Sequence, residues 1–464
     1  MNLPQAFTER TRQLLGEEQY PLFEQALQTE VPVSIRPNRL KCDKPVEGEL
    51  IPWASSGIYL SNRPTFTFDP LFHAGCYYVQ EASSMFVERV LQEYVKEPAV
   101  MLDLCAAPGG KSTLCRTALP EGSLLVANEV MRNRSKVLAE NLIKWGYSDV
   151  VVTNNDPVDF TDLTHLFDVI LTDVPCSGEG MFRKDQVAVD EWSVENVDIC
   201  WKRQRRILAD IWSALKPGGI LIYSTCTFNR EEDEDNVLWI AKELGAEVLS
   251  VPVEDDWGIT GNLIGNDFPV YRFLPHHTKG EGFFLAVLRK DEGELEKIAL
   301  RSEKKKKGKD NKQPLVVPKE VKSWLESGSA YTYMMKDTNV VAFPKAYEQE
   351  YTLLQHYLKV IHAGVTLGEI KGKDLIPHHS LAMSTDLADG VFPKAELSYD
   401  QAIAYLRKEG LVLEGDVPRG YVLVTYQQIP LGFVKNIGNR ANNLYPQEWR
   451  IRSGYLPEEV VCVF

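Results

Sequence analysis

From about residue 98 onward, short apolar runs alternate with longer segments whose apolar residues recur at helical spacing. Five of these runs predict strands, each with a polar residue at or near its end: AVMLDL (99–104), LLVANE (124–129), DVVVTNND (149–156), FDVILTDVP (167–175) and GILIYSTC (219–226). Helical segments follow from position 111, over 133–145 and over 197–215. This alternation predicts an α/β fold in which helices cover both faces of a parallel sheet. We expect 282–290 to close the sheet as an edge strand.

The segments on either side of this sheet have different patterns. Residues 1–75 predict a small mixed α/β domain, in which two helical patterns precede the basic segment IRPNRLK and short alternating strands. The sheet and its helices are expected over 76–292, and a basic linker over 293–314. Two further units follow, 315–388, which we expect to be helical, and 389–464, where β-branched and aromatic residues alternate with polar ones.

Length and composition are those of a globular protein of several domains. The 464 residues exceed one ordinary core, and 44% hydrophobic with 10% aromatic residues excludes wholesale disorder. No apolar run reaches the roughly 18 residues that a membrane-spanning helix needs. The first residues, MNLPQAFTERTRQLL, lack the apolar core of a signal peptide. We therefore expect a cytoplasmic protein.

The eight cysteines carry no metal-binding spacing. None belongs to a Cys-x-x-Cys pair, so a zinc ribbon or a thioredoxin-like motif is excluded and no metal site is expected. In a reducing cytoplasm most free thiols are simply small buried hydrophobes. A catalytic cysteine must therefore be identified by its context.

The net charge of −14 argues against a nucleic-acid partner, but its distribution is uneven. The segment 301–312 holds seven Lys or Arg against two acids, and 419–452 holds five against one. These runs could form a basic face for RNA. A solvated linker and an ordinary surface are the alternatives.

The loop DLCAAPGGKS (103–112) lies between the first predicted strand and its helix, where open parallel sheets bind ligands. Pro108 favours a turn, and Gly109 and Gly110 allow backbone amides to approach a ligand closely. A phosphate-binding P-loop is excluded because Cys105 stands where its first glycine would be. The dinucleotide fingerprint Gly-x-Gly-x-x-Gly is also absent. A plain structural turn remains the alternative.

Acidic residues follow the next strands. Glu129 is placed to bridge two ribose hydroxyls, and Asp156 could accept a hydrogen bond from an adenine amino group. Asp173 ends the fourth strand. Each acid alone could be a solvated strand end. Together, beside a Pro-Gly-Gly loop without a phosphate fingerprint, they predict a nucleoside cofactor, and S-adenosylmethionine fits better than NAD.

Two cysteines follow the fourth and fifth strands, Cys176 in DVPCSGEG and Cys226 in STCT. Neighbouring strands lie about 5 Å apart, so both thiols would face the cofactor cleft. Methylation of carbon 5 of cytosine needs such a pair, because one thiolate must add at carbon 6 and a base must later remove the carbon 5 proton. Asp173, protonated or sharing a proton with N3, is the expected partner of the ring. Two buried thiols are the alternative, and spacing alone does not assign the two roles.

These segments resemble the motifs of the RNA (cytosine-5) methyltransferase family over about 100–290. The resemblance implies a Rossmann-like S-adenosylmethionine-dependent methyltransferase sheet, in which Cys226 attacks carbon 6 and Cys176 assists elimination. Asp173 is the third expected catalytic residue. The resemblance implies that the following residues contact the cofactor: Cys105, Ala106, Ala107, Pro108, Gly109, Gly110, Lys111, Glu129, Asp156 and Asp173.

The flanking units narrow the expected substrate. The N-terminal domain and the tail LGFVKNIGNRANNLYPQEWRIR resemble the RsmF branch of this family, which modifies 16S ribosomal RNA, and the tail is similar to PUA-type RNA-binding modules. The resemblance therefore implies rRNA processing by a protein that binds 16S rRNA or the small ribosomal subunit. The sequence itself does not reveal the oligomeric state, and a monomer is the default expectation. A transfer RNA methyltransferase and a non-catalytic RNA-binding assembly factor are the alternatives, although a pure binder needs neither thiol.

Overall fold

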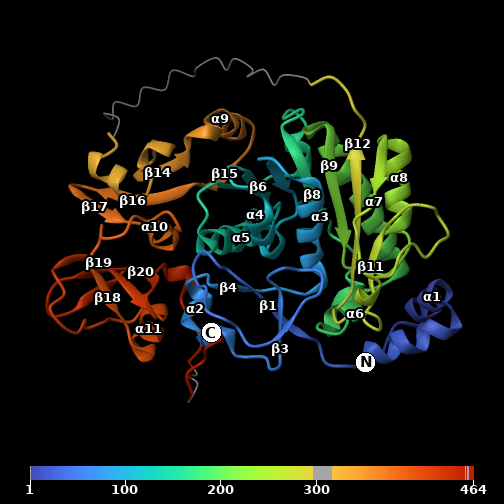
Figure 1. Cartoon of the computed structure of the whole chain (residues 1–464), viewed down its shortest axis with the longest axis horizontal. Coiled ribbons are helices and arrows are strands. Elements are labelled where there is room, and N and C mark those ends of the chain that lie inside the picture. The colour runs from blue at the N-terminus through green and yellow to red at the C-terminus, as the bar shows by residue number, and fades with distance from the viewer. Residues whose placement is uncertain (1, 296–315, 455, 457–458) are drawn as a thin grey trace.

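The structure is a computed structural model that describes residues 2–295, 316–454, 456 and 459–464 (Figure 1). Most of the basic linker expected at 293–314, including the Lys-rich run, lies outside the described residues. Four sheets form in the described part of the chain. The largest has nine strands, in the order β10-β12-β9-β8-β5-β6-β7-β15, with β11 paired to β12.

The five strands predicted from the apolar runs form the centre of this sheet and are parallel to one another. They are β5 (Val100–Asp103), β6 (Leu124–Asn128), β7 (Val150–Thr153), β8 (Phe167–Asp173) and β9 (Leu215–Thr225). Nearly all of their residues are buried, as expected for strands that are covered on both faces. The predicted adjacency of β8 and β9 is confirmed, with Asp173 opposite Ser224.

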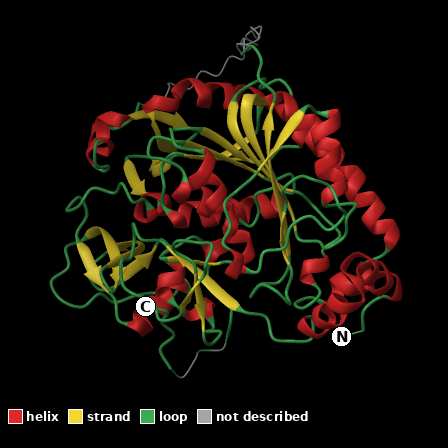
Figure 2. Cartoon of the chain, turned by 45° about the vertical axis from the view of Figure 1, so that its right-hand side comes forward, coloured by secondary structure: helices red, strands yellow, loops and turns green. Residues whose placement is uncertain are grey.

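Helices cover both faces of the sheet because successive strand residues point to opposite sides. In β5, Met101 packs with one layer of helices, whereas Val100 and Leu102 pack with the other. The first layer comprises α3 (Val87–Tyr94), α4 (Gly110–Ala118) and α5 (Arg132–Trp145). The second comprises α7 (Val194–Ile211), α8 (Glu234–Glu243) and α9 (Glu348–Tyr357). Figure 2 shows helices on both sides of the fanned strands.

The prediction that 282–290 is an edge strand is wrong. This segment forms β12 (Phe283–Lys290), which lies antiparallel between β9 and β10 (Ala246–Leu249). Strand β10 has only four residues, of which one is buried, so it carries too little alternation to be recognised from sequence. At the other end, β15 (Val360–Ala363) adds antiparallel to β7, so β10 and β15 are the outer strands.

The N-terminal segment divides into a helical arm and a small sheet. The arm, α1 (Gln5–Ala26), is broken at Gly16, whose φ of 83° is non-helical, so the two predicted helical patterns are confirmed. In Figure 1 the arm lies beside α6 (Gln186–Glu191), apart from the small sheet. That sheet has the order β2-β3-β1-β4, formed by Glu49–Leu50, Ile58–Leu60, Val33–Pro37 and Tyr77–Val79.

The prediction that 315–388 is helical is wrong, because a four-stranded sheet dominates the described part of this unit. Its strands, in the order β13-β14-β16-β17, are Tyr331–Lys336, Asn339–Pro344, Val365–Lys371 and Asp374–Pro377. Asp337, with φ of 54°, lies in the tight turn between the first two strands. Valine, aromatic and threonine side chains favour the strands on either side of this turn. The short helix α10 (His379–Met383) packs on the sheet.

The last unit shares its core with the N-terminal sheet. It comprises α11 (Tyr399–Leu406) and a sheet in the order β18-β19-β20-β21, which are Lys394–Glu396, Gly420–Tyr426, Ile429–Asn436 and Ala441–Asn443. Tyr405 and Leu431 belong to the same buried cluster as Ile35 and Tyr77. The two ends of the chain therefore pack together, although they lie far apart in sequence.

In the described residues, no helix is both long and apolar enough to span a bilayer.

Candidate active site

The segments that follow β8 and β9 leave the sheet at the same edge, because the two strands are parallel neighbours. Cys176 and Cys226 lie on these segments, and their Sγ atoms are 3.1 Å apart. Both side chains are partly exposed. The predicted convergence of the two sulfur atoms is thus confirmed.

The two thiols are not equivalent. The hydrogen bond with Cys226 raises the pKa of the Cys176 thiol well above its usual value, and burial and the charge of Glu232 act in the same direction. The two thiols therefore differ in environment, and the raised pKa of Cys176 favours its protonated form.

The glycine-rich loop between β5 and α4 is held open by contacts from α5. Arg134 donates to the Ala107 carbonyl at 2.7 Å, and Asn141 donates to the Pro108 carbonyl at 2.7 Å. Gly109 caps α4 with φ of 115°, a left-handed conformation that favours glycine. The loop therefore presents its backbone toward the carboxyl edge of the sheet.

A cavity of about 350 Å³ joins this loop to the cysteine segments. Most of the predicted residues line it: Cys105, Ala106, Ala107, Pro108, Gly110, Lys111, Asp173 and Cys226. Residues from outside the sheet complete its walls: Tyr78, Val79, Gln80, Glu81, Ser84, Gly180, Met181, Lys184, Glu281, Gly282 and Phe283. Asp103 also contributes. The size is in the range of small-molecule sites, which runs from about 300 to 1,000 Å³.

Lys111 and Asp173 form an ion pair inside this cavity. The distance from Lys111 Nζ to Asp173 Oδ2 is 2.9 Å, and Ser224 Oγ donates to Asp173 Oδ1 at 2.8 Å. Burial is the largest single influence on the pKa of Lys111 and lowers it, but the charge and the hydrogen bond of Asp173, together with the charge of Asp103, contribute to a net rise. A thiolate at Cys226 adds to the same effect. The sequence assigned Lys111 only to the cofactor loop, whereas the structure pairs its ammonium group with Asp173 in a cavity that Cys226 also lines.

Glu129 and Asp156 follow β6 and β7 and lie outside the lining of this cavity. Glu129 is buried, accepts a hydrogen bond from the Met131 amide at 2.8 Å and pairs with Arg134 at 3.4 Å. Asp156 is more exposed and caps the turn 157–160. Both lie at the carboxyl edge, in the strand order that the sequence predicted.

Sequence reasoning missed Asp103, the last residue of β5. Its Oδ2 accepts from Ser112 at 2.6 Å, whereas the buried Oδ1 finds no hydrogen-bond donor in the described part of the chain. Burial is the main cause that raises the pKa of Asp103 to about 7. A strand-terminal acid directly before the glycine loop was the signal that could have identified it.

Two buried glutamates behind the cysteine segments were also missed. Glu179 accepts from the Phe228 and Asn229 amides at 2.6 and 3.0 Å, and Glu232 accepts from the Ser177 amide at 3.0 Å. Burial raises the pKa of Glu232 to about 7. The acid-rich run 231–236 resembles a solvated surface in sequence, so its burial was not foreseeable from composition.

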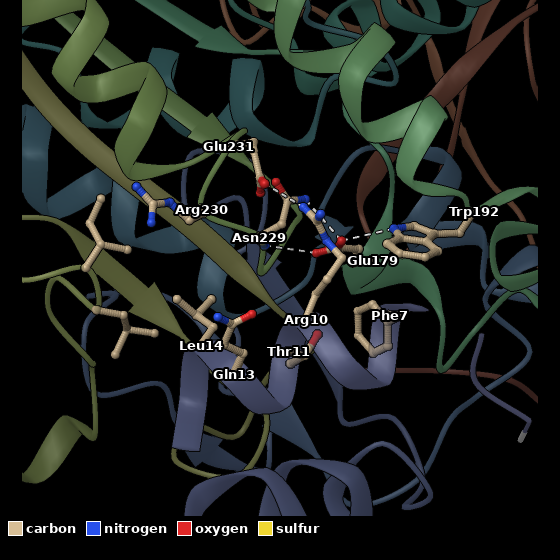
Figure 3. A pocket seen from close by; sticks show the side chains of 12 residues that line it. Phe7, Arg10, Thr11, Gln13, Leu14, Glu179, Trp192, Asn229, Arg230 and Glu231 are labelled. Carbon is tan, nitrogen blue, oxygen red and sulfur yellow. Dashed lines mark hydrogen bonds and ion pairs between the residues drawn. The ribbon is translucent and has the colours of Figure 1, made fainter. Parts of the chain in front are cut away.

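A second cavity, of about 360 Å³, lies between the N-terminal arm and the segments that contain Glu179 and residues 229–231 (Figure 3). Arg10 of α1 pairs with Glu231 at 2.6 Å on one side, and Trp192 donates to Glu179 at 3.0 Å on the other. Phe7 packs edge-on against Trp192. The arm therefore contacts the same elements that support the cysteine segments.

No group of three or more His, Cys, Asp or Glu side chains suited to a metal ion occurs among the described residues.

Three family models match the chain in order. Residues 3–82 match the N-terminal domain of 16S rRNA methyltransferase RsmF, 90–289 match 16S rRNA methyltransferase RsmB/F, and 392–451 match the methyltransferase RsmF PUA domain. The matched segments include the small N-terminal sheet, the central sheet except β15, and the C-terminal sheet.

Curated relatives match along nearly the whole chain. Ribosomal RNA small subunit methyltransferase F of Citrobacter koseri is 33% identical over 421 residues, covering 88% of this chain and 85% of the relative. The protein of the same name from Erwinia tasmaniensis is 30% identical over 478 residues, covering 98% of each chain. Among solved structures, a methyltransferase homolog protein from Pyrococcus horikoshii is 29% identical with a TM-score of 0.53, covering 62% of this chain and 95% of that chain.

Proposed function

Because the chain belongs to the ribosomal RNA small subunit methyltransferase F family, we propose that it transfers a methyl group from S-adenosylmethionine to carbon 5 of a cytosine in 16S ribosomal RNA. The observation that carries this proposal is the 3.1 Å separation of the Cys176 and Cys226 sulfur atoms beside the glycine-rich loop. Methyl transfer to oxygen or nitrogen needs no thiol, whereas carbon 5 methylation needs a nucleophile that adds to carbon 6 and a base that removes the carbon 5 proton, and two thiols can fill these roles.

Cys226 is the nucleophile in this proposal. Its thiolate adds to carbon 6 of cytosine, and the electron pair of the C5–C6 double bond makes carbon 5 nucleophilic. The nearby ammonium group of Lys111 stabilises that thiolate, and the Cys176 thiol donates a hydrogen bond to it. The resemblance to RNA (cytosine-5) methyltransferases implies the same assignment.

Lys111 and Asp173 stabilise the charge that develops on the cytosine ring in this proposal. Attack at carbon 6 places negative charge on N3, and the ion pair offers a proton and a positive charge to that position. Ser224 fixes the second oxygen of Asp173 and so orients the carboxylate. The sequence analysis expected Asp173 to share a proton with N3 of cytosine, and we propose that Lys111 takes part in the same interaction.

Cys176 completes the reaction as the base for elimination. Attack by Cys226 weakens the hydrogen bond and removes the negative charge that both raise the pKa of Cys176, so Cys176 becomes easier to ionise once the C6–S bond has formed. Its thiolate then takes the proton from carbon 5. The C5–C6 double bond returns, the C6–S bond breaks, and Cys226 leaves as a thiolate.

The chain has residues that fit S-adenosylmethionine. Asp103 offers a buried carboxylate oxygen without a protein donor, and the backbone of 105–111 is open to a ligand. Glu129 would hold the ribose hydroxyls and Asp156 the adenine amino group, with Asp173 beside the reacting end. When bound, the cofactor supplies an electrophilic methyl group on a sulfonium ion. All of these residues come from one chain, so a monomer is sufficient.

The substrate assignment rests on the flanking units. The names of the relatives and the matched N-terminal and PUA domains favour RNA of the small ribosomal subunit over transfer RNA. The target base must leave any helix to reach the cavity, so the flanking units would hold the surrounding RNA.

Bisulfite mapping of ribosomal and transfer RNA tests the proposal in a strain that lacks the protein. We expect at least one 5-methylcytosine of 16S rRNA to disappear and to return when the wild-type gene, but not the Cys226→Ser gene, is supplied. Unchanged 16S rRNA with a lost 5-methylcytosine in transfer RNA would contradict the substrate. No change in either RNA would contradict the reaction.

A further inference from the structure

The segment that carries Cys226, residues 225–229, is anchored by a buried group of charged residues outside the cavity lining. The group consists of Arg272 in β11 (Tyr271–Phe273), and Asp233 and Glu234 at the start of α8. The side chain of Arg272 is 1% exposed and those of the two acids are 0% exposed. We call these three residues the Arg272 cluster.

One carboxylate oxygen holds both neighbours of Cys226. Asp233 Oδ1 accepts from Thr225 Oγ1 at 2.7 Å and from Thr227 Oγ1 at 3.0 Å. The two hydroxyl oxygens are themselves 2.8 Å apart. The residues immediately before and after Cys226 are therefore both held, through their side chains, by the same buried carboxylate oxygen.

Arg272 forms an ion pair with that carboxylate and a hydrogen bond with the Phe228 carbonyl. Its Nη1 lies 3.0 Å from Asp233 Oδ2 and donates to the Phe228 carbonyl at 2.9 Å. Its Nε donates to Glu234 Oε1 at 2.8 Å, and its Nη2 contacts the other oxygen of Glu234. The guanidinium group presents donors from three nitrogens in a rigid planar fork, which the single nitrogen of an ammonium group cannot reproduce.

The opposite side of the segment is also fixed. Glu179 accepts from the Phe228 and Asn229 amides, as its position beside Asn229 in Figure 3 illustrates. The Gly180 amide donates to the Cys226 carbonyl at 2.8 Å. The segment is thus held between the Arg272 cluster and the 179–180 turn, which leaves its sulfur little freedom to turn away from Cys176.

Stability alone is a poor reason for such a cluster. Removing charges from water is costly, and replacing buried ion pairs with well-packed apolar side chains is often neutral or stabilising. The Arg272 cluster has two acids for one base, so it is not even balanced. Directional hydrogen bonds, in contrast, fix the geometry of a neighbouring segment in a way that apolar packing does not.

We propose that Arg272 is a positioning residue for Cys226, acting through Asp233 and the hydroxyl groups of Thr225 and Thr227. This inference rests on the proposed role of Cys226 as the nucleophile. Arg272 aims the sulfur at carbon 6 and keeps it near Lys111 and Cys176. It contributes to the rate of attack and not to binding of the cofactor or the RNA.

The test compares Arg272→Lys and Thr227→Val with two matched controls. Thr227→Ser keeps the hydroxyl group, and Arg116→Lys alters another buried arginine, which pairs with Asp149 at the opposite edge of the same sheet. Single-turnover methyl transfer to rRNA, the Kd of S-adenosylmethionine and the Tm are measured for each. We expect about 10- to 100-fold slower transfer for Arg272→Lys and Thr227→Val, because small displacements of a reacting atom have effects of this size. The Kd should change less than about threefold, and both controls should keep the wild-type rate.

A second measurement is independent of the substrate. Alkylation of Cys226 by iodoacetamide, followed by mass spectrometry, reports its reactivity in the free chain, with the exposed Cys462 as internal standard. We expect slower alkylation of Cys226 in Thr227→Val and Arg272→Lys, because the sulfur moves away from the Lys111 charge, and wild-type alkylation in Thr227→Ser.

Wild-type rates of methyl transfer and of Cys226 alkylation in Thr227→Val would overturn the inference. A slower transfer in Arg272→Lys that is fully explained by a lowered Tm would overturn it as well. If Arg272→Lys does not fold, the comparison of Thr227→Val with Thr227→Ser tests the inference on its own. If the wild-type chain methylates no RNA, the proposed function fails, and the alkylation rates alone decide whether Arg272 positions Cys226.

Discussion

The Sγ atom of Cys176 lies 3.1 Å from that of Cys226, although fifty residues separate them in the chain. The pairing of β8 with β9 brings them together, and their hydrogen bond raises the pKa of Cys176 well above its usual value. The environments of the two thiols thus differ before any substrate binds. This asymmetry predicts that the two single substitutions have different consequences.

Replacing each cysteine with serine separates attack from release. In Cys176→Ser the thiolate of Cys226 still adds to cytosine but elimination is slow, so we expect a covalent protein–RNA adduct that persists on a denaturing gel. Cys226→Ser should form neither adduct nor methylated product, and Cys462→Ser, at an exposed thiol, should behave as the wild type. Adduct in Cys226→Ser but not in Cys176→Ser would reverse the assigned roles.

Lys111→Met removes the cation beside Asp173 and Cys226. We expect methyl transfer to fall by about 100-fold, in the range for loss of a general acid, because charge at N3 and the thiolate both lose stabilisation. Single-turnover kinetics with labelled S-adenosylmethionine measure this. The matched control is Lys216→Met, which breaks the 2.6 Å pair with Asp168 at the opposite end of β8 and should leave the rate unchanged. Equal losses in both variants would contradict a role for Lys111 in the reaction.

The raised pKa of Asp103 predicts how the stability of the folded chain depends on pH. Burial raises its pKa from 3.8 to about 7, so between these values the folded chain retains a proton that the unfolded chain has released. Stability must therefore fall as pH rises through this window, by about 3 to 5 kcal/mol for the cofactor-free protein. Asp103→Asn removes this contribution, so its Tm relative to the wild type should be higher at pH 8 than at pH 5. A pH-independent difference in Tm, measured by differential scanning fluorimetry, would contradict the prediction.

Features that depend on local pattern could be predicted from the sequence. Buried strands form continuous apolar runs, so β5 to β9 were identified, and their polar ends located the carboxyl edge. The Pro-Gly-Gly loop predicted a turn, and Gly109 in that turn has a left-handed φ of 115°. Cys176 and Cys226 could be brought together because parallel strands that are consecutive in an α/β sheet are often neighbours.

Features that depend on distant partners could not be predicted. The position of β12 inside the sheet is set by β10, and β15 joins β7 from a unit that begins beyond position 315. The sequence analysis placed Lys111 only in the cofactor-binding loop. Its ion pair with Asp173 could not be foreseen, because Lys111 follows β5 and Asp173 ends β8. Asp233 and Glu234 lie in an acidic run that only the buried Arg272 explains.

The C-terminal PUA unit also supports the N-terminal sheet. Tyr399 donates to the Phe68 carbonyl at 3.0 Å, and the Val463 amide donates to Asp69 at 3.2 Å. Tyr77 of β4 lies 5.8 Å from the ring of Phe464. A unit that served only as a detachable RNA-binding module would not share buried side chains with the rest of the chain.

Deletion of 389–464 should therefore destabilise the remaining chain as well as weaken RNA binding. Each large apolar side chain that loses its burial contributes about 2 kcal/mol, and several such side chains of the shared cluster, Tyr77 among them, would be uncovered. We expect a lower Tm, increased binding of a hydrophobic dye and a loss of methyl transfer that saturating RNA does not restore. Supplying 389–464 as a separate chain should recover part of the Tm. An unchanged Tm with only a raised KM for RNA would show instead that the unit is an independent module, because the N-terminal sheet would then be stable without its partner.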